Sequence, residues 1–364
     1  MSGIYGVLGL NTTDSQLTYV QTIGQRAIYD AVNEVLSMHT ADLTAAMSWL
    51  VEGPTENHKE RYMLPGGGRL QRLADTGRPF AVKATGSWDV AYPLEEFGAK
   101  IEASRVAFAY MTMADLDRHI NTVMQQNINT MRFEMLKALL NNTDDTFVDP
   151  IRGSLTIKPL GTGSTDGVLY PPVLGSESEQ TLDRYAESGY AGSSISDTND
   201  PIVTIVNALE ASFGTPTGGS QIVVFINNAQ TAKVTALTAF TGVTNIHINP
   251  GTNINTVLNL PPGLPGRVLG VHEDSGAIVV EWRWIPANYL LGIHLGQPAP
   301  LKMRVDPGYT NLPRGLTLVA QSDEYPFSES IYSHRFGFGV GNRLNGYVLE
   351  LGTGGSYSIP SGYS

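Results

Sequence analysis

The sequence predicts an α+β fold, because helical and strand patterns occupy different stretches of the chain. Amphipathic helical patterns cover residues 14–50, and one much longer helix follows at 113–142. A strand-like stretch broken by Gly and Pro separates these helices, and short strands and helices fill the second half. With 364 residues, 41% of them hydrophobic, the chain is long enough to bury a core of its own.

Composition excludes several classes of protein. The chain has no Cys, which rules out disulfides and thiolate metal sites. Only 16% of the residues are charged, and no repeat or low-complexity tract argues for a solenoid or a disordered chain. The N-terminus lacks a basic stretch before an apolar one, and no apolar run approaches the roughly 18 residues of a membrane span. We therefore expect a soluble protein made in the cytosol, with no membrane partner.

The N-terminal residues predict two helices. Asp14 can cap a helix over residues 14–38, in which apolar residues recur at steps of three and four. Thr40 is placed to cap a second, shorter helix that Gly53 and Pro54 would end. We expect these helices to form an N-terminal arm.

Residues 58–101 predict two long strands that run out and back around a tip rich in Gly and Pro. They include the basic segment, defined here as residues 57–86, which has six basic and two acidic side chains. Its local balance of +4 contrasts with a net charge of −11 for the whole chain. The basic residues are Lys59, Arg61, Arg69, Arg72, Arg78 and Lys83.

The charge of the basic segment is consistent with three uses: docking on an acidic surface of a neighbouring copy, binding to DNA, or simple solvation. The rest of the chain carries −15, so the surface as a whole repels nucleic acid. Only Tyr62 and Phe80 are aromatic residues interleaved with the basic ones. Docking on a neighbouring copy is therefore the favoured interpretation.

The longest helical pattern begins after Thr112, which has the spacing of a capping box with Asp115. About 30 residues at 1.5 Å each make a helix of about 45 Å, much longer than the average helix. We expect it to act as the spine of its domain. Its apolar stripe consists of Leu116, Ile120, Val123, Ile128, Met131, Met135 and Leu139.

The second half of the chain alternates between strands and helices. Asp200 and Pro201 mark the start of a capped helix that runs to Phe213. Further strands are expected at 154–159, 221–226, 267–271 and 278–282, and helical segments at 182–189 and 229–237. Residues 331–340 and 347–351 predict a long hairpin that ends in a soft Gly/Tyr/Ser tail.

No motif for catalysis emerges from the sequence. The glycines at 161, 163 and 167 have the wrong spacing for a phosphate loop and no Lys-Ser or Lys-Thr after them, and no Gly-x-Ser-x-Gly elbow is present. The seven His residues never have the spacing of a zinc helix. We predict a protein that is not an enzyme and has no catalytic residue, cofactor or metal.

Other polar and aromatic clusters have ordinary structural interpretations. We expect the turn at 272–274, which contains His272, to be solvated, and His294 to be a hydrogen-bonded strand residue. Asp144 and Asp145 are interpreted as the exit of the long helix rather than as calcium ligands. Residues 281–286 predict a strand with both of its Trp side chains on one face.

The order of these parts resembles the Hong Kong 97-type fold of the major capsid proteins of tailed double-stranded-DNA bacteriophages. Residues 88–98 look like the closing strand of the extended loop in that family. Residues 183–189 are similar to the segment that leads into the axial domain, and residues 334–346 to the hairpin of the peripheral domain. The resemblance covers nearly the whole chain.

The resemblance implies a division of the chain: an N-terminal arm (1–56), an extended β loop (57–103), a peripheral domain (104–190 and 320–364) with the spine helix 113–142, and an axial domain (191–319). It also implies a structural protein that self-assembles as pentamers and hexamers into an icosahedral shell around double-stranded DNA. The six basic residues would then be inter-subunit contacts of the extended loop.

The main partners of such a subunit are other copies of the same chain. Further partners are a portal protein, a separate scaffolding protein and, in some shells, a decoration or cement protein. It is found in the virion after assembly in the host cytoplasm, and it encloses DNA without reading its sequence. An encapsulin-like shell protein of a bacterial nanocompartment is the alternative of related fold. An α+β hydrolase is the alternative from a different class.

Overall fold

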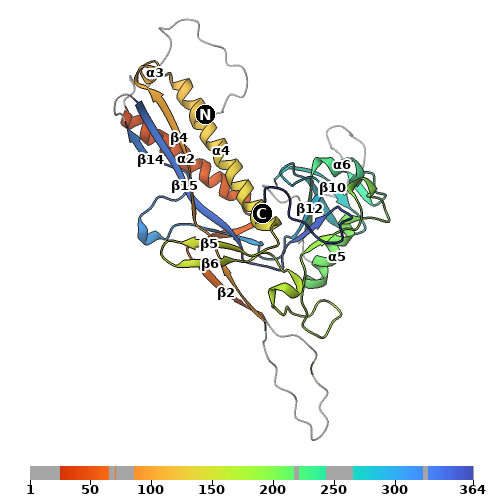
Figure 1. Ribbon diagram of the computed structural model, residues 1–364. Coiled ribbons are helices and arrows are strands. Elements are labelled where there is room, and N and C mark those ends of the chain that lie inside the picture. Colours follow the sequence, from red (N-terminus) through yellow and green to blue (C-terminus); the bar gives the residue numbers. More distant parts are fainter. Residues whose placement is uncertain are drawn as a thin grey trace. The chain divides into compact units, whose positions relative to one another are not determined.

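The computed structural model in Figure 1 describes residues 25–64, 70, 86–216, 221–242, 265–322 and 327–363. The chain divides into two compact units. Unit 1 comprises the described parts of Met1–Leu43, Glu96–Thr130 and Pro313–Arg335, and unit 2 those of Thr44–Glu95, Met131–Leu312 and Phe336–Ser364.

Unit 1 packs two helices on a small sheet in which β14 and β15 are antiparallel. The helices are α2 (Gln25–Met47) and the first part of α4 (Met113–Leu140), and α3 (Arg105–Ala109) is a short helix between β4 and α4. In the sheet β15 (Phe327–Val340) pairs with both β4 (Glu95–Ser104) and β14 (Thr317–Ser322). Its core consists of Val32, Leu36, Ile120, Val123, Leu316, Leu318 and Tyr332.

The prediction of two N-terminal helices is wrong, because α2 runs without a break through Thr40. Thr40 does not cap a helix. Its Oγ1 donates to the Leu36 carbonyl oxygen one turn earlier (3.0 Å) and accepts from the backbone N–H of Leu316 (3.3 Å). Asp14, the predicted cap of the first helix, lies outside the described residues.

The predicted spine helix is confirmed as α4, which has 28 residues and is about 42 Å long at 1.5 Å per residue. Thr112 and Asp115 form the predicted capping box: the Asp115 N–H donates to Thr112 Oγ1 (3.2 Å), and Asp115 Oδ2 accepts from the Thr112 N–H (3.4 Å) and hydroxyl (2.8 Å). Most of the apolar stripe is buried, from Ile120 to Leu139.

Unit 2 contains a seven-stranded sheet in the order β7-β16-β12-β8-β11-β10-β9. Its central strands β8, β11 and β12 are buried along their whole length. The strands are β7 (Tyr185–Glu187), β8 (Ile222–Ile226), β9 (Phe240–Gly242), β10 (Arg267–His272), β11 (Ala277–Glu281), β12 (Tyr289–His294) and β16 (Tyr347–Glu350).

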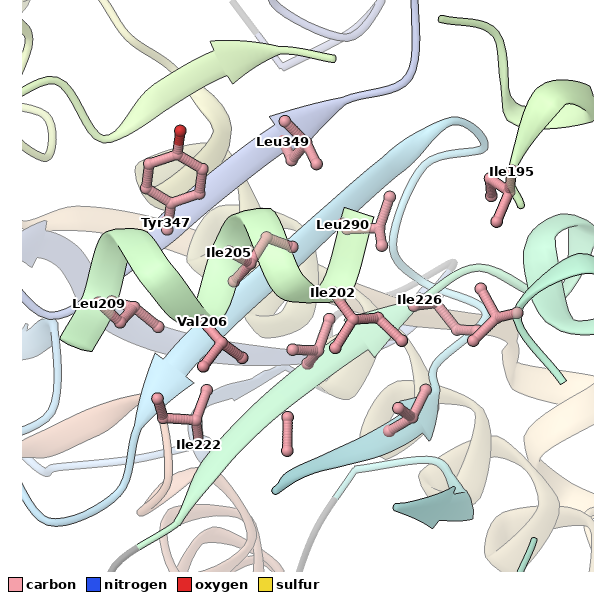
Figure 2. Packing of buried hydrophobic residues seen from close by; sticks show 14 of the residues in the cluster. Ile195, Ile202, Ile205, Val206, Leu209, Ile222, Ile226, Leu290, Tyr347 and Leu349 are labelled. Atoms are coloured by element: carbon pink, nitrogen blue, oxygen red, sulfur yellow. The ribbon is translucent and has the colours of Figure 1, made fainter. Parts of the chain in front are cut away.

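Helix α5 (Pro201–Phe213) covers one face of this sheet, and α6 (Asn228–Val234) follows β8. As predicted, Asp200 caps α5: its Oδ1 accepts from the N–H groups of Ile202 (2.8 Å) and Val203 (3.3 Å). Figure 2 shows the apolar side of α5 lying against Ile222, Ile226, Leu290 and Leu349, which belong to three different strands. The helix thereby closes the main core of unit 2.

Smaller elements complete unit 2. β1 (Val51–Thr55) pairs in parallel with β13 (Leu301–Arg304), which pairs with the last residues of β15. Two hairpins are formed by β2 (Lys59–Met63) with β3 (Ser87–Ala91) and by β5 (Asp145–Asp149) with β6 (Gly153–Ile157). The short 3₁₀ turns are η2 (Gly163–Asp166), η3 (Gly192–Ser194) and η4 (Gly308–Thr310).

One expectation for the region before β8 is wrong. Residues 182–189 contain the strand β7 instead of a helical turn, because β7 finds a parallel partner in β16 and the buried Arg184 donates to the Ala208 carbonyl oxygen (2.8 Å).

Asp144 and Asp145 follow the end of α4, as expected. β5 begins at Asp145, and the Asp144 carboxylate pairs with Lys158.

The predicted C-terminal hairpin does not form. β15 and β16 are strands, but they lie in different sheets. The connection between them is buried: the Arg343 guanidinium donates to the carbonyl oxygens of Pro159 (2.7 Å) and Leu160 (3.2 Å), and Asn345 Nδ2 donates to those of His294 (3.0 Å) and Pro298 (2.8 Å). These bonds hold the chain away from the tight turn that a hairpin needs.

The strand prediction for residues 281–286 is also wrong. β11 ends at Glu281, and the Ile285 N–H donates to the Trp282 carbonyl oxygen (3.0 Å) in a turn. The two Trp side chains therefore have different neighbours. Trp282 packs edge-on against Phe225, and Trp284 lies under the Arg132 guanidinium, 5.6 Å from the ring centroid.

The C-terminal tail is packed rather than soft. The Tyr357 hydroxyl donates to the Leu140 carbonyl oxygen (2.6 Å), and the Tyr363 ring stacks on Phe133. From β7, the Tyr185 hydroxyl lies 3.0 Å from the Leu139 carbonyl oxygen and 2.8 Å from that of Asn141. Two phenol groups thus lie within hydrogen-bond distance of carbonyl oxygens at the C-terminal end of α4, where the last turn leaves such groups without intrahelical partners.

We expect Tyr185→Phe to lower the free energy of unfolding by about 1–3 kcal/mol, because the buried helix end then lacks its donor. Urea denaturation of the unassembled protein measures this change. Tyr309→Phe is the control, since Tyr309 is 78% exposed and its hydroxyl can bond to water. Equal stability of the two variants would contradict the capping role of Tyr185.

Candidate functional site

The base of the basic segment is the two-stranded ribbon of β2 and β3. Lys59 lies opposite Ala91, Arg61 opposite Asp89 and Met63 opposite Ser87. Because side chains alternate along a strand, Lys59, Arg61 and Met63 share the exposed face of β2, and Glu60 and Tyr62 share the other. The ribbon thus has a charged outer face and a mixed polar and aromatic inner face.

On the outer face, Asp89 binds both basic side chains. Arg61 donates through Nε to Oδ1 (2.6 Å) and through Nη2 to Oδ2 (3.0 Å), and Lys59 Nζ lies 2.9 Å from Oδ2. Hydrogen bonds from Arg61 and then Lys59 hold the pKa of Asp89 well below its usual range. The outer face therefore keeps a net positive charge, although neither basic group is unpaired.

On the inner face, the Glu60 carboxylate accepts hydrogen bonds from five side chains. Oε1 accepts from Thr55 (3.1 Å) and Asn57 (3.1 Å). Oε2 accepts from Tyr62 (3.0 Å), Tyr92 (3.1 Å) and Lys302 (2.9 Å). Thr55 ends β1, Asn57 lies between β1 and β2, Tyr62 lies in β2, Tyr92 directly follows β3, and Lys302 lies in β13.

The ionisation of this cluster follows from its bonds. Burial opposes the charge on Glu60, but hydrogen bonds from Lys302, Asn57 and Tyr62 lower its pKa to about 2. Burial likewise opposes the charge on Lys302, and bonding to Glu60 more than offsets it, so the pKa of Lys302 is raised. Both groups are therefore charged at neutral pH.

Aromatic packing also attaches the ribbon to the rest of unit 2. The Tyr62 ring stacks on Trp88 at a centroid distance of 5.5 Å, and Trp88 packs against Tyr170 at 5.7 Å. Trp88 Nε1 donates to the Gly341 carbonyl oxygen (3.2 Å). Together with Val90 these rings form a separate buried cluster. The ribbon is thus bonded firmly to unit 2.

The six predicted contact residues divide into two groups. Lys59 and Arg61 lie on the ribbon and are brought together by Asp89. The other four, Arg69, Arg72, Arg78 and Lys83, lie outside the described residues. Sequence reasoning missed the role of Glu60: the alternation of β2 places it beside Tyr62, but its partner Lys302 is 242 residues away and no local pattern connects the two.

The turn at 272–274 is solvated at Glu273 and Asp274, as expected, but the expectation is wrong for His272. His272 is fully buried; its Nε2 lies 2.8 Å from Asp200 Oδ2, and its Nδ1 lies 2.9 Å from Ser275 Oγ. A Ser, a His and an Asp are thus adjacent, but Asp200 also caps α5 and the ring has no exposed surface. The arrangement fixes the turn after β10 to the start of α5. His294, as expected, is a buried strand residue, and it accepts from the Gly296 N–H.

Within the described ranges, no three His, Asp or Glu side chains are grouped so that they could hold a metal ion. None of the helices described combines the length and the apolar character needed to cross a bilayer.

Comparison of the sequence with protein-family models and with curated proteins finds no match. Among solved structures, a chain of Mycobacterium phage Patience is similar with a TM-score of 0.66 and 18% identity, over 96% of each chain. A chain from the mature capsid of bacteriophage PhiM1 is similar with a TM-score of 0.50 and 6% identity, over 83% of this chain and 85% of that one. The SrpI encapsulin of Synechococcus elongatus PCC 7942 gives a TM-score of 0.41 at 11% identity, over 96% of this chain and 95% of that one. The predicted fold, an α+β capsid fold of the Hong Kong 97 type, is confirmed.

We expect Glu60→Gln to lower the free energy of unfolding at pH 7 by up to about 3 kcal/mol, because the pKa of Glu60 is depressed in the folded state. Such stability is present above the unfolded pKa of about 4.5 and is lost as the pH falls toward about 2. The difference between variant and wild type should therefore shrink over that range in urea denaturation.

Glu52→Gln is the matched control, since Glu52 is more exposed and lies 3.7 Å from the same Lys302 Nζ. It should change stability little at any pH. If the effect of Glu60→Gln were independent of pH, the hydrogen-bonded carboxylate would not be what attaches the ribbon.

Proposed function

We propose that this chain is the major capsid, or head, protein of a tailed double-stranded-DNA bacteriophage. In this function it assembles as pentamers and hexamers into an icosahedral shell that encloses the genome. The observation that carries the proposal is the match of nearly the whole chain to one fold, at 96% of both chains for the phage Patience structure. A shell subunit uses its fold as a building block, and this is a structural role rather than an enzymatic one.

The ribbon and the basic segment supply the inter-subunit contact in this proposal. Residues 57–103 act as the extended loop, and the Glu60 cluster holds its base rigid on its own subunit. A rigid base reduces the entropy lost when the rest of the segment docks on a neighbour. The positive charge of Lys59, Arg61, Arg69, Arg72, Arg78 and Lys83 then orients the approach, and many repeats of a weak contact make the shell stable.

The remaining segments take the roles that the resemblance assigns to them. Residues 1–56 form the arm, 104–190 with 320–364 the peripheral domain, and 191–319 the axial domain. Outside the basic segment the chain carries −15, so it neutralises few phosphates, and the packaged DNA can slide along the shell. A portal, a scaffolding protein and a decoration protein are the expected partners, and the mature protein resides in the virion after assembly in the host cytoplasm.

Expression of the chain alone and together with its genomic neighbours tests the proposal. We expect icosahedral particles of megadalton mass, or the pentamers and hexamers that build them, in light scattering and negative-stain microscopy. Double-stranded DNA inside native particles supports the virus, whereas enclosed protein cargo and no DNA would support the nanocompartment. A monomer of 39.2 kDa under all conditions, including with a scaffold, would overturn the shell.

Reversing two charges of the basic segment should block assembly without unfolding the subunit. We expect the double variant Arg69→Glu and Arg72→Glu to lower the particle yield at least about tenfold, because like charges then face each other at every contact. Circular dichroism and the melting temperature should stay unchanged.

The matched control reverses two exposed basic residues elsewhere, Arg118 and Lys233. This variant should assemble like the wild type. Normal particle yield from the Arg69 and Arg72 variant would contradict the role of the basic segment.

A further inference from the structure

Unit 2 carries an arginine patch, defined here as Arg132, Arg267 and Arg283. Arg132, on α4, lies over the Trp284 ring, 5.6 Å from its centroid. Arg283 directly precedes Trp284 in the chain. Arg267 and Arg283 share the carboxylate of Glu281, at 2.8 and 3.7 Å. Three positive charges thus meet one negative charge, which leaves a local balance of +2.

Most of the hydrogen-bond donors of the arginine patch are unused. A guanidinium has five N–H donors. Arg267 gives one hydrogen bond to Glu281 (2.8 Å), and the 3.7 Å between Arg283 and Glu281 is too long for another. Arg132 makes no hydrogen bond or ion pair with any residue that the structure describes. The side chains of Arg267 and Arg283 are 70% and 78% exposed, so their remaining donors are open to an external partner.

Elsewhere in unit 2, guanidinium groups that leave solvent have partners within the fold. Arg343 donates to two carbonyl oxygens and pairs with Asp166. Arg304 pairs with Asp149 (2.8 Å). Arg132 is half-buried as well, but its contact is an aromatic ring, which supplies no acceptor oxygen. Its donors are therefore suited to an anion that comes from outside the chain.

The acidic residues nearest in sequence do not cancel the charge of the patch. Glu273 and Asp274 occupy the turn of the β10–β11 hairpin, whereas Glu281 lies at its open end. On α4, Glu134 follows Arg132 by two residues and so lies about 200° further around the helix. Burial lowers the pKa of Arg132, and no carboxylate of the described residues raises it again.

We propose that the arginine patch binds phosphate groups of the double-stranded DNA that the shell encloses. The proposal rests on the proposed function and deepens it by naming a surface of unit 2 that contacts the DNA. A guanidinium presents parallel N–H donors that match two oxygens of one phosphate. Contacts to phosphates carry no sequence information, as a shell around a whole genome requires.

The surface around the patch favours DNA over an acidic protein as the partner. Protein interfaces have an apolar core, whereas surfaces that bind DNA are polar and positively charged. None of the large apolar residues in 131–140 or 265–300 is exposed. The patch therefore offers the donors that phosphates need and lacks the apolar centre that a protein partner needs.

A balance of +2 in each subunit agrees with DNA that can still slide along the shell. Each phosphate contact changes the slope of log K against log[salt] by about 0.9, so two contacts per subunit give a weak affinity that depends on salt. Because the patch is repeated in every subunit, the DNA can leave one patch and meet the next.

Titration of a labelled DNA duplex of about 30 base pairs with the full chain tests the contact in solution. We expect Arg132→Gln with Arg283→Gln to weaken binding at least about tenfold at low salt, and to reduce the salt slope by about 1.8, in fluorescence anisotropy. Arg283→Gln alone, at a side chain that is 78% exposed, should reduce the slope by about 0.9 without affecting the fold. Arg132→Lys with Arg283→Lys keeps both charges and should bind within about threefold of the wild type. Equal affinity of the double Gln variant and the wild type would overturn the proposal.

A matched control separates the patch from net charge. Arg152→Gln with Lys233→Gln makes the same change in net charge at two exposed positions elsewhere in unit 2. This control should change the affinity by less than about twofold, and an equal loss in both variants would refute the proposal. The partner would instead be an acidic protein surface, and the proposal wrong, if Arg132→Gln with Arg283→Gln bound DNA normally but failed to assemble.

Formaldehyde, which links Lys amines to DNA bases, tests the contact inside the particle. DNA-filled particles of Arg283→Lys subunits should give a nucleotide adduct at residue 283 in mass spectrometry. The yield should be at least about tenfold higher than at residue 152 in Arg152→Lys particles, because only residue 283 lies where phosphates bind. No adduct at residue 283, or equal adducts at both positions, would contradict the proposal.

The two proposals fail in different ways. If wild-type subunits form no particles, or native particles hold no DNA, the proposed function is wrong. If native particles hold DNA and residue 283 gives no adduct, the shell function stands and the arginine patch is not a DNA contact.

Discussion

The arrangement of the candidate site depends on one carboxylate. Glu60 accepts from five side chains, and the donors lie in β1, in the turn before β2, in β2 itself, directly after β3 and in β13. Glu60 is only partly exposed, so its charge is favoured when its hydrogen-bonding capacity is satisfied, and each of these elements contributes to that. The bonds on Glu60 consequently attach the ribbon to the rest of unit 2. They thereby also determine which way the outer face with Lys59, Arg61 and Asp89 points.

The parts of the fold that could be predicted from the sequence are those set by local chemistry. Asp200 and Pro201 cap α5, and Thr112 and Asp115 begin α4, because the groups that bond lie within three residues of one another. Thr40 shows the limit of this reasoning. A Thr hydroxyl can cap a helix or bond to the carbonyl group four residues earlier, and the choice here coincides with a contact to Leu316, which is far away in the sequence.

Long-range pairing explains the remaining differences. β7 is a strand because β16 lies beside it. The expected C-terminal hairpin does not form, because Arg343 and Asn345 make buried contacts elsewhere in the fold. The same holds for the site. Charge counting identified the basic segment. The pairing of Lys59 and Arg61 with Asp89 depends on the register of β2 against β3. The bond from Lys302 to Glu60 depends on a strand more than 200 residues later in the sequence.

The position of β16 has a consequence for synthesis on the ribosome. β16 lies between β7 and β12, yet among the described strands it comes last along the chain. Until residues 347–350 have left the exit tunnel, β7 has no strand to pair with, and the Tyr357 hydroxyl that bonds to the end of α4 has not been made. A chain that ends before residue 347 therefore cannot complete the sheet of unit 2.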